Sequence, residues 1–231
     1  MRRTFGLFFA VAVFAAAMSA QEIYIKPVDE AAKDPSLMEF RSKLIDAAER
    51  KDMKYVISVM DPKIKLSFGG HEGIADFKQI WQPDIEGSLF WNELLAVLKN
   101  GGVFGKDTED GNKTFYAPYT FTSFPDYPEL DIFRDGAIIG KDVNLRAKPS
   151  LNAKVIGSLS YNVVMIDHQG SVMKKKTPGI DMETYEWYKV ETLGGKKGFV
   201  HADHVRGHVD HRIGLEKQNG KWKITMFIAG D

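Results

Sequence analysis

Four histidines near the C-terminus have the residue type and spacing of a candidate metal site. His201, His204, His208 and His211 follow the pattern H-x2-H-x3-H-x2-H, and neutral imidazole is the commonest metal-binding side chain in proteins. All four would share one face of a continuous helix, but Gly207 makes a helix unfavourable there. In extended chain, His208 and His211 point to opposite faces. The sequence therefore favours exposed histidines on a strand edge and a linker, and a zinc site stays open as the less favoured alternative.

Three tryptophans are candidates for the wall of a small-molecule pocket: Trp81, Trp91 and Trp222. Aromatic rings supply the apolar surface that lines most ligand pockets. Large aromatic residues at helical or strand spacing are more often part of a hydrophobic core, however. The sequence leaves both interpretations open.

No residue is assigned a catalytic role. Carboxylate catalysis needs two groups in different environments at a fixed distance, and no spacing pairs Asp76, Asp84 and Glu86 in that way. The chain also has no Gly-x-Ser-x-Gly turn, no phosphate-binding glycine loop and no His-Glu-x-x-His motif. These motifs mark common nucleophile, phosphate and zinc sites. We expect a protein that binds rather than catalyses, with no cofactor and no resident metal.

An aromatic segment lies in the middle of the chain. Aromatic rings bind the apolar faces of sugars, and they also dominate the energetics of cores and interfaces. Prolines in the same segment stiffen it, which suits a connector docked between two domains. The sequence favours this docking over a carbohydrate-stacking platform. The aromatic residues are Phe115, Tyr116, Tyr119, Phe121, Phe124, Tyr127 and Phe133.

Charge and cysteine content narrow the function classes. Lysine plus arginine and aspartate plus glutamate number 31 each in the 231 residues. Such a balance provides no basic field for nucleic acid, so we expect no nucleic-acid partner. The chain has no cysteine, which leaves no disulfide and no thiolate ligand or nucleophile. It also leaves no residue for a lipoprotein anchor.

The first twenty residues have the layout of a cleavable secretory signal. Arg2 and Arg3 precede an apolar run over 5–17, and small residues lead to Ala20. This order of positive, apolar and small residues is typical of a signal peptide. The apolar run is shorter than the roughly 20 residues of a membrane span. We therefore expect segment 1–20 to be removed, and a periplasmic or secreted protein with no membrane insertion of the mature chain.

The N-terminal part is predicted to hold helices and a strand. Ser36 and Glu39 stand at capping-box spacing, which indicates the start of the first helix. Asp52 is placed to cap a second, short helix. Apolar and polar residues alternate over 64–68, which predicts a half-buried strand. Further helices are expected over 73–81 and from residue 88 to about 98.

The last residues of the chain predict a β-hairpin. Strands near 212–217 and 221–229 flank Asn219-Gly220, a dipeptide that suits a type I′ turn. One face of the second strand is apolar, and an isolated hairpin is only marginally stable in water. We therefore expect the hairpin to return to the N-terminal part, so that residues 21–134 and 207–231 form one discontinuous domain.

Residues 143–206 carry the pattern that is most specific for a fold. Val143-Asn144-Leu145-Arg146 is followed by Val155-Ile156-Gly157-Ser158-Leu159, Trp187-Tyr188-Lys189-Val190 and Gly198-Phe199-Val200. In these residues the chain resembles the bacterial Src-homology-3-type domain, a small β-barrel. The resemblance implies an inserted barrel domain at 135–206. The expected fold is α+β: N-terminal helices with a small antiparallel sheet completed by the C-terminal hairpin, plus the inserted barrel.

The barrel resemblance also implies a function. Domains of this type bind and do not catalyse, and related domains in some cell-wall hydrolases bind peptidoglycan peptides. The implied function is an exported binding protein that recognises a cell-envelope ligand, either peptidoglycan or another protein. We expect Tyr161, Tyr185, Trp187 and the long segment 167–186 to form the ligand-binding surface.

The flanking parts resemble a second group, the nuclear-transport-factor-2-like superfamily of α+β cone folds. The resemblance rests on two helices, a strand, Gly69-Gly70, a further helix and the hairpin around Asn219-Gly220. Such folds often enclose a pocket, which Trp81, Trp91 and Trp222 would line here. This resemblance implies the alternative function, a small-molecule-binding or hydrolytic α+β domain with the barrel as an accessory.

Overall fold

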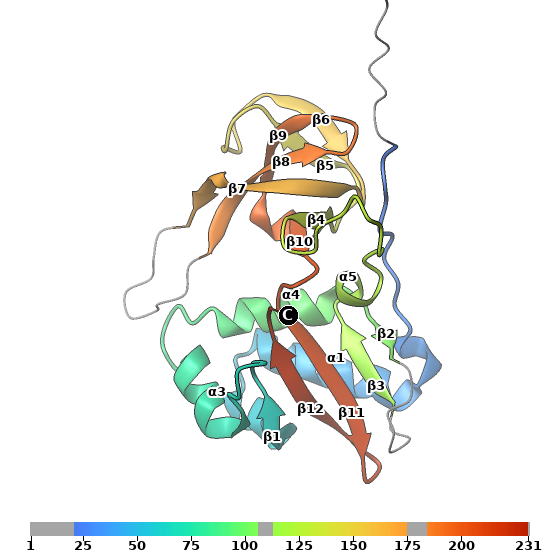
Figure 1. Ribbon diagram of the computed structural model, residues 1–231. Helices are drawn as coiled ribbons and strands as arrows, with labels where there is room; N and C mark the ends of the chain where they lie inside the picture. The colour runs from blue at the N-terminus through green and yellow to red at the C-terminus, as the bar shows by residue number, and fades with distance from the viewer. Residues whose placement is uncertain (1–20, 106–112, 175–183, 231) are drawn as a thin grey trace, which may run out of the picture.

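The computed structural model describes residues 21–105, 113–174 and 184–230, and the predicted signal peptide lies outside them. Helices and one sheet form the lower region in Figure 1, and a second sheet forms the upper region. No helix among the described residues is long and apolar enough to cross a membrane.

The first two α-helices of the lower region begin at side-chain caps. Asp34 accepts a hydrogen bond from the backbone N–H of Ser36 at 2.8 Å, so the first helix is capped two residues before the predicted position. Pro35 occupies its first turn, where a missing N–H costs nothing. Asp52 caps the second helix, as predicted. The helical segments are η1 (Ala31–Lys33), α1 (Pro35–Glu49), α2 (Met53–Ser58), α3 (Gly73–Trp81), α4 (Phe90–Lys99) and α5 (Tyr119–Thr122).

The C-terminal hairpin returns to the N-terminal part, as predicted, and it lies in the centre of the lower sheet. The sheet has the order β1-β12-β11-β3-β2. Asn219 and Gly220 both have positive φ, at 49° and 76°, which fits the type I′ turn. The strands are β1 (Met60–Lys65), β2 (Val103–Phe104), β3 (Thr114–Ala117), β11 (Arg212–Gln218) and β12 (Lys221–Ile228).

One strand pair differs from the predicted antiparallel sheet. β1 runs parallel to β12, whereas β11 is antiparallel to both β12 and β3. β1 also begins at Met60, before the predicted strand 64–68. Pro62 is tolerated inside it because β1 is an edge strand of the sheet. The sheet is therefore mixed.

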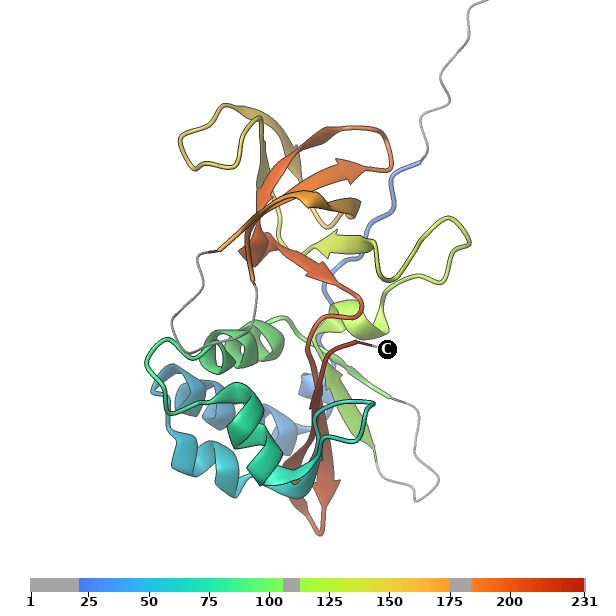
Figure 2. The same ribbon diagram turned by 60° about the vertical axis from the view of Figure 1, so that its left-hand side comes forward.

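Helices α1 and α4 cover one face of this sheet, and among the described elements no helix covers the other face (Figure 2). The inner face of the hairpin contributes Leu215, Ile224 and Phe227 to the core, which helices α1, α3 and α4 complete. This core supplies the apolar contacts that the isolated hairpin lacks.

The inserted region is an antiparallel half-barrel with the order β10-β4-β7-β8-β9-β5-β6. Its core contains Ile138, Val143, Leu145, Leu159, Val164, Ile166, Val190, Val200 and Val205. The strands are β4 (Asp135–Ile138), β5 (Val143–Arg146), β6 (Val155–Leu159), β7 (Val163–Met173), β8 (Tyr185–Thr192), β9 (Lys197–His201) and β10 (Val205–Gly207), with a short helix η2 (Ala202–His204) before the last. The predicted α+β fold with an inserted barrel is confirmed, while the domain boundaries remain a prediction.

The aromatic connector is largely docked, which is the interpretation that the sequence favours. Tyr119 and Phe124 pack with Ile25 and Val163 in a third apolar cluster, between the connector and the barrel. Phe115 lies in the main core instead. Two aromatic residues stay at the surface, Tyr127 at 49% and Phe133 at 63% exposure.

Candidate functional site

A large bulge interrupts the pairing of β7 and β8. Asp167 lies opposite Lys189 and Val172 lies opposite Trp187, so residues 168–171 of β7 face the single residue Tyr188. Bulges of this kind re-aim side chains and are frequent beside functional sites. The predicted loop 167–186 is shorter as a result, because β7 continues to Met173 and β8 begins at Tyr185. Residues 175–183 lie outside the described part of the chain.

Hydrogen bonds within the bulge fix its shape. The N–H of Gly170 donates to Asp167 Oδ1 at 2.9 Å, and the hydroxyl of Ser171 donates to the Asp167 carbonyl at 2.7 Å. The N–H of Lys189 donates to the Ser171 hydroxyl at 2.9 Å. A side chain at Gly170 would come within 2.6 Å of both Asp167 and Lys189, so glycine permits this close approach. The bulge is thus a preformed element.

The bulge brings three rings together. The ring centroids of Tyr185 and Tyr188 are 4.8 Å apart, and His168 lies 5.6 Å from Tyr185 and 6.1 Å from Tyr188. Both tyrosines are half-buried, and His168 is exposed. We name Asp167, His168, Tyr185, Tyr188 and Lys189 the bulge site. Its rings offer apolar faces with polar edges, which suits a ligand that has both kinds of surface.

An ion pair borders these rings. Lys189 Nζ lies 2.9 Å from Asp167 Oδ2. The hydrogen bond from Lys189 lowers the pKa of Asp167, and the backbone N–H of Gly170 adds to this effect. Burial raises the pKa of Tyr188, and the nearby charge of Asp210 adds to it. At neutral pH the bulge site therefore offers a carboxylate, an ammonium group and a phenol that can donate a hydrogen bond.

A charged cluster lies at the junction between the barrel and α4. Arg206, only 6% exposed, donates through Nη2 to Glu93 Oε1 and to the His211 carbonyl, both at 2.6 Å. The N–H of Gly207 donates to Asp210 Oδ2 at 2.7 Å. We name Glu93, Arg206, Asp210 and His211 the junction cluster. It connects α4 of the lower region with β10 of the barrel.

The pKa values of the two acids in the junction cluster are shifted in opposite directions. Burial acts to raise the pKa of Glu93, but Arg206, through its charge and its hydrogen bond, and His211 together leave this pKa below its ordinary value. Burial raises the pKa of Asp210 despite the opposing effect of Arg206. Glu93 is therefore held as the charged partner of Arg206.

The junction cluster predicts a pH dependence of stability. Burial lowers the pKa of His211 to about 4 from the ordinary 6.5, although Glu93 opposes this. A histidine with a lowered folded-state pKa contributes full stability above pH 6.5 and loses it as the pH falls toward 4. We expect the free energy of unfolding to fall by about 2 to 3 kcal/mol. This is less than the full pKa difference implies, because the His211 side chain is 27% exposed and solvent screens its interactions.

The measurement compares the free energy of unfolding of the wild type and His211→Phe between pH 7 and pH 4. The variant keeps an aromatic ring in stacking contact with Phe227 but cannot titrate. The raised pKa of Asp210 acts in both proteins, so the difference between the two curves reports the titration of His211 and its interaction with Glu93. Parallel curves would contradict the prediction.

Of the residues expected on the barrel surface, Tyr185 lies in the bulge site. Trp187 is only 3% exposed, with the ring of His201 edge-on at 5.1 Å. Tyr161 adopts a positive φ of 61°, and its carbonyl accepts a hydrogen bond from the N–H of Ile25. Only Tyr185 therefore contributes to the ring cluster.

The three tryptophans expected around a pocket lie in the main core. The indole N–H of Trp91 donates to the Pro83 carbonyl at 3.0 Å, and that of Trp222 donates to the Ser36 hydroxyl at 2.9 Å. Trp81 packs against Phe227 with the ring centroids 5.1 Å apart. These positions fit the core interpretation of the sequence.

The four C-terminal histidines are dispersed. His201 and His204 have ring centroids 6.4 Å apart, whereas His208 packs against Phe121 and His211 belongs to the junction cluster. In the part of the chain that the structure describes, no three His, Cys, Asp or Glu side chains come together in a way that could hold a metal ion.

The sequence predicts only part of the bulge site. Asp167, His168 and Tyr185 fall within the segment 167–186 that is expected on the binding surface, but only Tyr185 is expected there as an individual residue. Tyr188 and Lys189 belong to the strand that marks the barrel fold. Tyr185 and Trp187 alternate with Glu186, and this short alternation is the available signal that the strand begins at Tyr185. A bulge has no comparable signature in a single sequence.

Residues 141–206 match the family model of the bacterial SH3 domain. The matched range contains β5 to β9, the bulge site and Arg206 of the junction cluster. This part of the chain is therefore a bacterial SH3 domain, as the pattern at 143–206 predicted. No curated protein and no solved structure matches the chain. For the flanking parts, the resemblance to the nuclear-transport-factor-2-like superfamily stays a prediction.

Proposed function

We propose that this chain is an exported, non-catalytic binding protein whose bacterial SH3 domain recognises the cell envelope at the bulge site. The observation that carries the proposal is the ring cluster of His168, Tyr185 and Tyr188 on a rigid bulge of β7 and β8. Bacterial SH3 domains commonly bind cell-wall components. The signal-like segment 1–20 supports the same location.

The ligand that fits the bulge site best is the peptide part of peptidoglycan. Its alkyl side chains suit the faces of the tyrosine rings. Its free carboxylates and amino groups complement Lys189 and Asp167, which already face each other across the two strands. Binding of this kind needs preorganised contacts and no proton transfer. An envelope protein is the alternative ligand.

Retention on purified peptidoglycan tests the proposal. We expect Tyr185→Ala to weaken binding by about 2 kcal/mol, roughly 30-fold in Kd, because aromatic anchors carry much of the energy at binding sites. The measurement is a co-sedimentation isotherm of the full mature chain with insoluble peptidoglycan. Tyr127→Ala is the matched control, since this tyrosine is exposed on the connector, outside the bulge site, and should bind as the wild type does.

Three results would overturn the proposal. The wild type would fail to sediment with peptidoglycan, or Tyr185→Ala would sediment as well as the control, or the purified chain would turn over peptidoglycan. In the first case, the wild type could still capture an envelope protein that Tyr185→Ala does not capture. This result would show that the bulge site binds a protein in place of peptidoglycan.

A further inference from the structure

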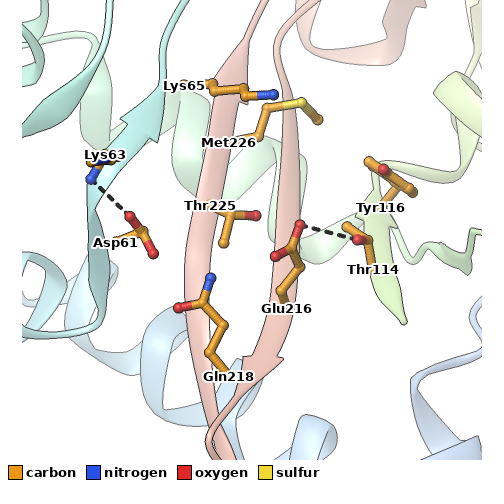
Figure 3. A pocket seen from close by; sticks show the side chains of 9 residues that line it. All are labelled: Asp61, Lys63, Lys65, Thr114, Tyr116, Glu216, Gln218, Thr225 and Met226. Atoms are coloured by element: carbon orange, nitrogen blue, oxygen red, sulfur yellow. Dashed lines mark hydrogen bonds between the residues drawn. The ribbon is translucent and has the colours of Figure 1, made fainter. Parts of the chain in front are cut away.

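A hollow lies on the α+β region, on the sheet face that α1 and α4 do not cover. It has a volume of about 310 Å³, at the small end of the range for ligand pockets. Figure 3 shows its side chains, which rise from four neighbouring strands, β1, β12, β11 and β3. The lining residues are Asp61, Lys63, Lys65, Thr114, Tyr116, Glu216, Gln218, Thr225 and Met226.

Two local features of the sheet create this hollow. The register of β11 and β12 shifts between Gly214 and Leu215, so that Thr225 is the extra residue of a bulge and both it and Met226 line the hollow. Gly214 lies between Tyr116 and Met226 in the register and has no side chain. A Cβ there would come within 3.2 Å of Met226. The missing side chain leaves the floor of the hollow open.

The polar groups of the hollow are held in place. The Thr114 hydroxyl donates to Glu216 Oε1 at 3.2 Å, and the Thr225 hydroxyl donates to the Gly214 carbonyl at 3.3 Å. The Lys63 N–H donates to Asp61 Oδ1 at 2.7 Å. Figure 3 marks the first and third of these bonds. Side chains that are already oriented lose less entropy when a ligand binds.

The ring of Tyr116 is also fixed. It packs edge-on against Phe121, with the centroids 5.8 Å apart. A Cβ on Gly105 would come within 2.6 Å of this ring, so the backbone at Gly105 lies directly against it. Tyr116 therefore provides a rigid aromatic wall at the β3 side of the hollow.

The chemistry of the lining selects a class of ligand. Two lysines and two carboxylates leave no formal net charge, which disfavours a strongly anionic or cationic ligand. Thr114, Thr225 and Gln218 add hydroxyl and amide groups to this lining, and leaving such groups without partners disfavours a purely apolar ligand. A hydroxyl- and amide-bearing ring system would pair with Glu216 and Gln218 and contact Tyr116 through its apolar face.

We propose that this hollow binds a neutral saccharide of N-acetylated amino sugars. The site is separate from the bulge site and does not depend on it. The chain would then contact the envelope at two places, through peptide at the barrel and through sugar at the open sheet face.

The test is titration of the full mature chain with N-acetylglucosamine trimer, which contains no peptide, followed by calorimetry. We expect Glu216→Gln and Tyr116→Ala each to weaken binding at least tenfold. Glu216→Gln replaces a half-buried carboxylate by an amide of the same shape, so it remains informative if Tyr116→Ala, which also packs on Phe121, fails to fold. Lys221→Ala, exposed on the same hairpin, is the matched control and should bind as the wild type does.

Tyr185→Ala separates the two proposals. It should bind the saccharide normally, since it alters only the bulge site. Absence of saccharide binding by the wild type, or equal binding by Glu216→Gln and the control, would overturn the saccharide site and leave the peptide proposal intact. Loss of saccharide binding in Tyr185→Ala alone would place the sugar at the barrel and equally overturn the site on the sheet.

Discussion

Arg206→Met is expected to lower the free energy of unfolding by about 3 kcal/mol, at the low end of the range for breaking a buried ion pair. The substitution leaves the Glu93 carboxylate at the junction without its partner, 2.6 Å away in the wild type. Because Glu93 is 28% exposed, water can partly solvate its unpaired carboxylate. The expected loss of stability therefore lies at the low end of the range. The measurement is urea unfolding of the full chain, followed by circular dichroism.

Two further variants make this prediction specific. Arg206→Met combined with Glu93→Met should recover most of the lost stability, because replacing both partners by apolar groups is often neutral. Lys99→Met breaks an ion pair of equal length with Glu49 in which both side chains are about half exposed. This control should cost no more than about 1 kcal/mol. Equal losses in Arg206→Met and Lys99→Met would show that the junction cluster does not stabilise the protein.

Phe227→Ala is expected to destabilise the α+β region by about 3 to 5 kcal/mol, as the truncation leaves a cavity in the main core. The ring lies 5.1 Å from Trp81 and 5.8 Å from Phe90, so it joins the C-terminal hairpin to α3 and α4. Tryptophan fluorescence during thermal unfolding is a suitable measurement, since three of the four tryptophans lie in this core.

Phe133→Ala provides the matched control for this truncation. The same side chain is removed, but from a surface position that is 63% exposed. Its effect should stay within about 0.5 kcal/mol. A hairpin that contributed little to the core would give Phe227→Ala and Phe133→Ala similar transitions, which would contradict the described sheet.

The return of the hairpin could be predicted because two local signals agree. Asn219-Gly220 specifies the turn, and the apolar face of the following strand needs a partner that the completed barrel does not offer. The parallel pairing of β1 with β12 could not be predicted in the same way. It joins residues more than 150 positions apart, and no single-sequence signal specifies register over such a separation.

The candidate sites were less predictable than the fold. Trp187 has the residue type of a surface anchor, yet Val172 and His201 lie directly opposite it on the two neighbouring strands and cover it. The ring cluster depends on an irregular register between β7 and β8. Periodicity describes regular strands, so it identifies the elements but not the side chains that a bulge re-aims.

The hollow on the sheet depends on a second irregularity of the same kind. Thr225 and Met226 are consecutive in the sequence and would be expected on opposite faces of a regular strand. The bulge at Thr225 places both beside the position of Gly214. Both candidate sites therefore lie where regular pairing fails.

The most direct test of the peptide-recognition proposal is a titration followed by the amide NMR spectrum of the full mature chain. The titrant is a synthetic stem peptide of peptidoglycan that carries no sugar. Saturable shifts should be largest at 167–171 and 185–189 and should disappear in Tyr185→Ala. Shifts confined to other strands, or a spectrum that the peptide leaves unchanged, would show that the rings of β7 and β8 do not receive this ligand.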